Sequence, residues 1–60
     1  MVFYKHLAVS IEIKNGEIIC ETYRRDIDDE PFDNFTIPND VKVDDWEEYV
    51  INYIENNYLS

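Results

Sequence analysis

The sequence predicts a small α+β domain, in which a β-hairpin or a three-stranded antiparallel sheet packs on one C-terminal amphipathic helix in the order β-β-(β)-α. Three patterns indicate it. Apolar and polar residues alternate on both sides of Asn15-Gly16, a short β-prone run precedes Pro38, and apolar residues recur every three or four positions from Trp46 onward. Because the chain has only 60 residues, we expect residues 1–60 to form a single domain.

The hairpin is predicted from two strands, residues 6–13 and 18–24, joined through Asn15-Gly16. Asn-Gly is typical of a two-residue type I′ turn, because both residues tolerate a positive φ, and such a turn fixes the strand register. On the core face we therefore expect the pairs Ile13–Ile18, Ile11–Cys20 and Val9–Thr22. On the other face we expect Glu12–Ile19, Ser10–Glu21 and Ala8–Tyr23. Ile19 and Tyr23 would give this mostly polar face an apolar spot.

The rest of the chain is predicted to form a loop, a third strand and a helix. Residues 25–34 are rich in acids and contain Pro31, which is typical of a loop, and residues 35–37 read as a short strand ended by Pro38. Asp44, with Glu47 three residues later, resembles a capping box at a helix start. The stripe expected to cover the sheet consists of Trp46, Tyr49, Val50, Tyr53, Ile54 and Asn57. The opposite stripe consists of Glu48, Asn52, Glu55 and Asn56.

The charge is large and unevenly distributed. Hydrophobic residues make up 45% and aromatic residues 15% of the chain, which favours a folded domain over a disordered acidic tail. The formal net charge is −9. Residues 1–25 carry four basic residues against three acids, a net of +1, whereas residues 26–60 carry Lys42 alone against eleven acids, a net of −10. Such a charge repels nucleic acid and anionic membranes and attracts basic surfaces.

The residues that could carry catalysis or bind metal are few. His6 is the single histidine and has no nucleophile and acid arranged around it by any motif, while Cys20 is expected on the core face as a small apolar side chain. A calcium loop counted from Asp26 would need Gly at position 6 and Glu at position 12, but Pro31 and Ile37 stand there. The only glycine, Gly16, belongs to the hairpin turn, so no phosphate-binding loop is available. We therefore expect no enzyme, no metal and no cofactor.

The acids and aromatics are the candidate partner-binding residues. Acids in the first helical turn interact favourably with the helix dipole, whereas the acids at 26–33 have no such local explanation. A solvated acidic loop is one interpretation of the 26–33 cluster, and a contact surface for a basic partner is the other. The candidate partner-binding residues are Asp26, Asp28, Asp29, Glu30, Asp33, Asp44, Asp45, Glu48, Tyr23 and Tyr58.

Two functions are compatible with these features. The first is an acidic binding protein that masks or inhibits a basic, nucleic-acid-binding protein by imitating a phosphate backbone. Small acidic inhibitors from phages and mobile elements, including anti-CRISPR proteins and inhibitors of DNA-repair enzymes, act in this way as a class. The alternative is a structural module that forms a homodimer or larger assembly through sheet edges or through faces of unlike charge.

We also expect a soluble cytoplasmic protein without direct contacts to membrane or nucleic acid. Residues 1–6 lack the long apolar region of a signal peptide. No apolar stretch approaches the ~20 residues that span a bilayer.

Overall fold

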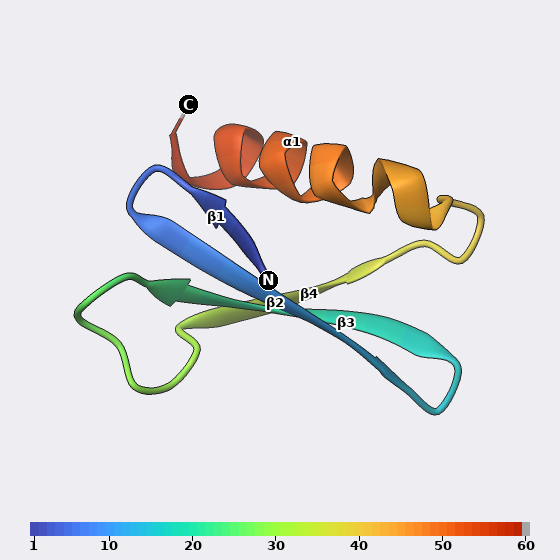
Figure 1. Ribbon diagram of the computed structural model, residues 1–60, viewed down its shortest axis with the longest axis horizontal. Helices are drawn as coiled ribbons and strands as arrows, with labels where there is room; N and C mark the ends of the chain where they lie inside the picture. The colour runs from blue at the N-terminus through green and yellow to red at the C-terminus, as the bar shows by residue number, and fades with distance from the viewer. Residues whose placement is uncertain (60) are drawn as a thin grey trace.

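The computed structural model describes residues 1–59 and places one helix over one face of a four-stranded antiparallel sheet (Figure 1). The elements are β1 (Val2–Tyr4), β2 (Leu7–Lys14), β3 (Glu17–Arg24), β4 (Asp33–Ile37), a 3₁₀ turn η1 (Val43–Asp45) and α1 (Trp46–Tyr58). The strands lie in the order β1-β2-β3-β4. The predicted α+β class and the strand at 35–37 are confirmed, and the sheet contains one strand more than the sequence predicted.

The hairpin register follows from its turn as predicted. Asn15 and Gly16 have φ of 53° and 79°, the two positive values that a type I′ turn requires. All six expected cross-strand pairs are present, from Ile13 opposite Ile18 to Ala8 opposite Tyr23. Because side chains alternate between faces along a strand, this register decides which residues enter the core.

Strand β1 was not predicted. It pairs with β2 through Val2–Val9, Phe3–Ala8 and Tyr4–Leu7, across a tight turn in which Lys5 has φ 53°. Three residues are too few to show the alternation of apolar and polar residues that predicts a strand. The turn also contains neither glycine nor asparagine, the residues that would have predicted it.

The core lies between α1 and the sheet face that it covers. Its fully or nearly fully buried side chains are Leu7, Val9, Ile18, Cys20, Phe35, Ile37, Val50 and Ile54. The Phe35 ring stacks on Tyr53 at a centroid distance of 3.8 Å, which joins β4 to the helix. The Tyr4 hydroxyl donates to Glu55 Oε2 at 2.9 Å, which joins β1 to the other side of the helix.

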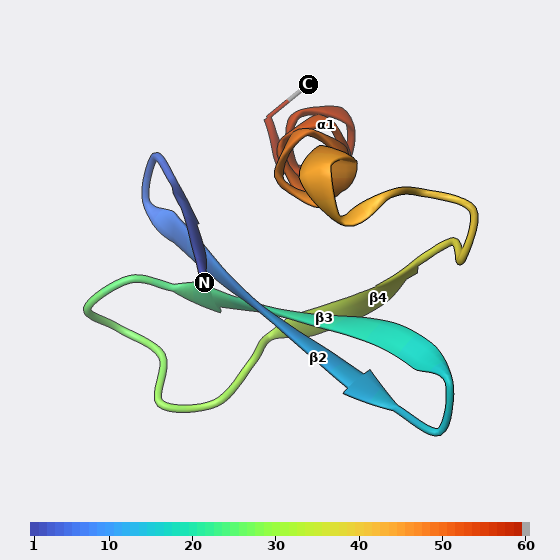
Figure 2. The ribbon, with the colours of Figure 1, turned by 45° about the vertical axis from the view of Figure 1, so that its right-hand side comes forward.

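The twist of the sheet removes the hairpin tip from this core. Ile13 belongs to the core face by register, yet its side chain is 66% exposed. Figures 1 and 2 show the turn between β2 and β3 reaching away from α1, so the helix does not cover it. A right-handed twist accumulates along long strands and turns their ends away from the helix. The register alone therefore does not predict which core-face residues α1 covers.

Two details of the predicted helix are wrong. The residue that precedes α1 is Asp45, helical itself and without a side-chain cap, so Asp44 and Glu47 form no capping box. Instead, η1 leads into the helix, and the Asp45 amide donates to Lys42 O at 2.8 Å. Asn57, expected on the covered stripe, is exposed, and its side-chain amide donates back to Tyr53 O at 2.8 Å.

Candidate binding surface

The start of α1 carries a dense group of exposed carboxylates. Asp44 and Asp45 end η1, and Glu47 and Glu48 follow in the first turn of the helix. All four residues are exposed, and no basic residue follows Lys42 in the chain. In the part of the chain that the structure describes, the ion pairs are Lys14–Glu12 and Arg24–Asp28, so none of these four carboxylates is neutralised by a cation.

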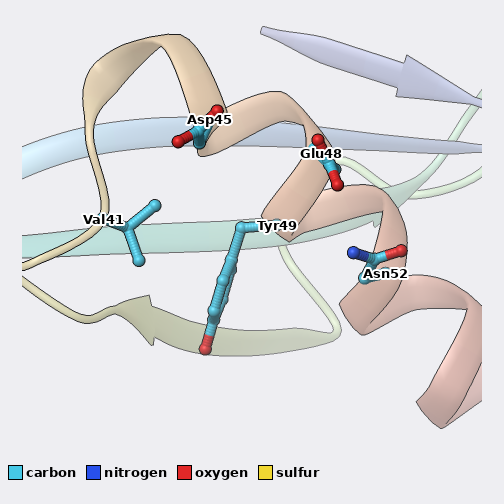
Figure 3. A pocket seen from close by; sticks show the side chains of 5 residues that line it. All are labelled: Val41, Asp45, Glu48, Tyr49 and Asn52. Carbon is cyan, nitrogen blue, oxygen red and sulfur yellow. The ribbon is translucent and has the colours of Figure 1, made fainter.

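A hollow of about 300 Å³ opens beside this group (Figure 3). Val41 and Tyr49 form its apolar walls, while Asp45, Glu48 and Asn52 lie along its helix side. The Trp46 indole donates from Nε1 to Val41 O at 3.1 Å and so holds the 38–42 segment against the helix start. The hollow therefore owes its shape to this bond and to the first turn of α1.

This hollow combines the groups that bind a guanidinium or an ammonium ion. Asp45 and Glu48 are three residues apart, a spacing that places side chains next to each other on a helix surface. A cation held between two carboxylates and the face of a tyrosine ring gains both charge attraction and a cation–π contact. The site thus has the chemistry to accept an arginine or lysine side chain of a partner.

The acids of the loop at 25–32 divide into structural and unpaired ones. Asp28 accepts from the Arg24 amide at 2.9 Å and from the Arg24 guanidinium through both carboxylate oxygens at 3.0 and 2.9 Å. Hydrogen bonding to Arg24 lowers the pKa of Asp28 below its usual value and raises that of Arg24. The Asp28 carboxylate therefore closes the loop onto β3. Asp26, Asp29 and Glu30 are exposed and form no ion pair with any described residue.

Asp33 and Tyr58 join the start of β4 to the last turn of α1. The Tyr58 hydroxyl donates to Asp33 Oδ2, and its ring packs edge-on against Phe32 and Tyr53 at centroid distances of 5.6 and 6.1 Å. Burial, and then the bond to Asp33, raise the pKa of Tyr58 well above its usual value. The Asp33 carboxylate and the Tyr58 hydroxyl bind each other. This internal contact gives both residues a structural role that needs no partner protein.

The candidate residues consequently lie in separate places. Asp44, Asp45 and Glu48 lie at the start of α1, whereas the loop at 25–32 lies at the opposite end of the molecule (Figure 1). Tyr23 lies on the sheet face that α1 leaves uncovered. The sequence missed Val41, Tyr49 and Asn52 as lining residues of the hollow. Tyr49 lies at the edge of the predicted apolar stripe of the helix. This position is the one sequence signal that its ring could contact both the core and a surface hollow.

Comparisons with protein-family models, curated proteins and solved structures found no match to this chain. Within residues 1–59, no helix is long and apolar enough to cross a membrane, and no group of three or more His, Cys, Asp or Glu side chains could hold a metal ion.

Proposed function

We propose that the protein is a non-enzymatic acidic binding protein that occupies the nucleic-acid-binding surface of a basic protein and so masks or inhibits it. The observation that carries the proposal is the unneutralised carboxylate group at the start of α1, beside a hollow that can take a basic side chain.

The density of this charge resembles that of DNA. Residues 44–48 place four carboxylates over about 6 Å of helix axis, since each residue advances the helix by ~1.5 Å. Double-stranded DNA carries one negative charge per ~1.7 Å of axis. A surface built to contact phosphates therefore meets a comparable density of negative charge here.

The hollow adds the contacts that phosphates cannot make. A partner arginine that enters between Val41 and Tyr49 would bury its aliphatic stem and keep its guanidinium at Asp45 and Glu48. Arginine side chains that are desolvated in a pocket are among the strongest contributors to interfaces. The phage and mobile-element inhibitors named above, among them anti-CRISPR proteins, are the class that this proposal fits by size and charge.

The test compares two matched pairs of substitutions. Asp45→Asn with Glu48→Gln removes two charges from the hollow, and Asp29→Asn with Glu30→Gln removes two charges from the loop at the far end. Tagged wild type and both variants are used to capture proteins from lysate, with elution by increasing salt and identification by mass spectrometry. We expect a nucleic-acid-binding protein that duplex DNA displaces, that the loop variant retains, and that the hollow variant loses.

Two results would contradict the proposal. One is a captured partner that DNA does not displace. The other is equal capture by the hollow variant and the wild type, which would show that the carboxylates at the start of α1 are only solvated.

A further inference from the structure

We infer that the uncovered face of the sheet is a homodimer interface, in which β3 of one copy lies antiparallel on β3 of a second copy. No helix or strand of residues 1–59 lies on this face, because α1 packs on the other one (Figure 2). The inference does not depend on the proposed function, since it concerns the opposite side of the molecule.

The uncovered face has an apolar end. Phe3, Ala8 and Tyr23 form one row across β1, β2 and β3. The Phe3 side chain is 60% exposed and that of Met1 is 72% exposed. These residues line a hollow of about 320 Å³, which is large enough for an aromatic ring of a second molecule, and its rim carries Arg24, Arg25, Asp26 and Asp28.

Two charges of opposite sign, neither of them in an ion pair with another described residue, flank Tyr23: Glu21 on β3 and Arg25 directly after the strand ends. Glu21 lies two residues before it on the same face, and Arg25 lies two residues after it. The Arg25 amide donates to His6 O at 2.8 Å, which continues the β2–β3 ladder by one more pair. The Arg25 guanidinium lies 4.9 Å from the centroid of the Phe3 ring and donates to Lys5 O at 3.3 Å. Within the described residues neither Glu21 nor Arg25 forms an ion pair, although acids outnumber bases almost three to one.

This arrangement is complementary to itself. A two-fold axis that crosses β3 at Tyr23 exchanges the positions two residues before and two residues after it, each about 6.6 Å from the axis. Arg25 of one copy then faces Glu21 of the other, and the reciprocal pair forms at the same time. The two Tyr23 rings meet at the axis, beside the two apolar hollows.

The distribution of the remaining charge favours the same interface. The uncovered face carries Glu12, Glu17 and Glu21 against Lys14 and Arg25, and the hollow at its apolar end adds Arg24, Asp26 and Asp28, which gives a net of −2 out of the total of −9. In the dimer the two acidic helices lie on the outside, about 30 Å apart at ~10 Å per packed layer. This separation is well beyond the screening length of ~8 Å at physiological ionic strength. The helix-side carboxylates stay exposed and are displayed twice.

Charge exchange tests the interface on the full chain. Sedimentation equilibrium from micromolar to millimolar concentration should show a wild-type dimer at physiological ionic strength. Arg25→Glu and Glu21→Arg should each weaken dimerisation at least about tenfold, because each change sets like charges against each other at both pairs. An equimolar mixture of the two single variants should form a heterodimer, since both of its pairs are then complementary.

Matched controls carry the same charge changes on the helix side. Lys42→Glu and Glu47→Arg should leave dimerisation within about twofold of the wild type. Circular dichroism checks that every variant is folded. Dilution of the wild type, followed by NMR, should shift the amide signals of Phe3, Ala8 and Tyr23 and leave those of Val50 and Ile54 unchanged.

Three outcomes would overturn the inference. The first is a wild type that stays monomeric at millimolar concentration. The second is a mixture of folded single variants that associates no better than either variant alone. The third is a dilution response confined to the outer edges of β1 or β4, which would show edge pairing instead of face packing.

Discussion

The helix is held to the sheet by two fully buried side chains, Val50 and Ile54, so Ile54→Ala should remove a large part of the stability. The substitution deletes three methyl or methylene groups from a side chain with 0% exposure. At ~0.8 kcal/mol for each buried group, the transfer contribution is about 2.4 kcal/mol. The cavity left between helix and sheet brings the expected loss to about 3 kcal/mol, after a few tenths recovered from the better helix propensity of alanine.

This loss is large against the stability of so small a domain. A chain of 60 residues is expected to have about 3–9 kcal/mol of unfolding free energy in total. Urea unfolding, followed by circular dichroism and by the fluorescence of Trp46, measures the difference directly. Ile27→Ala is the control, because that side chain is 71% exposed, and it should change stability by less than about 0.5 kcal/mol. A loss below about 1 kcal/mol for Ile54→Ala, or equal losses for the two variants, would refute the packing described here.

Four further predictions follow from individual features of the structure. Gly16→Ala should lower the free energy of unfolding by about 1 kcal/mol, because Gly16 has φ +79°, which strains a residue with a side chain. An added Cβ would meet no atom within 4 Å, so this backbone strain is the whole effect. An unchanged melting temperature would contradict the type I′ turn. Moderate salt should raise the melting temperature, because the described residues form only two ion pairs and most carboxylates repel one another; a flat response between low and physiological salt would show that the acids are already paired. Arg24 lowers the pKa of Asp28, so the Asp28 contribution to stability is present above the usual pKa of 3.8 and is lost as the pH falls through the lowered value. The melting temperatures of wild type and Asp28→Asn should therefore differ at neutral pH and converge in acid, and a difference that persists in acid would exclude this ion pair as its source. Burial raises the pKa of Cys20 to about 11, so a thiol reagent at mildly alkaline pH should label Cys20 only after urea unfolding; rapid labelling of the folded protein would show that the core is open at this position.

The candidate surface was only partly predictable. Asp45 and Glu48 were identified from the sequence because acids at a helix start are visible in a linear pattern. Their neighbour Val41 enters the hollow because the Trp46 indole binds its carbonyl group, a contact between a side chain and a loop that no periodicity describes. Asp28 and Asp33 looked like members of one acidic cluster, but each is engaged by a different internal partner, Arg24 and Tyr58.

The local interactions of the chain determined the hairpin and the helix. Asn15-Gly16 sets the register through two positive φ values, and the recurrence of apolar residues from Trp46 onward sets the helix, because both signals act between residues that are close in sequence. The tertiary structure decided the rest. Strand β1 forms because Val2 and Tyr4 can pair with the edge of β2. Ile13 is exposed because the sheet twists away from the helix before it reaches the hairpin turn. Tyr58 reaches Asp33 because the C-terminal end of α1 lies next to the start of β4. These contacts depend on how distant segments meet, and their free energies come from burial that only the folded arrangement creates.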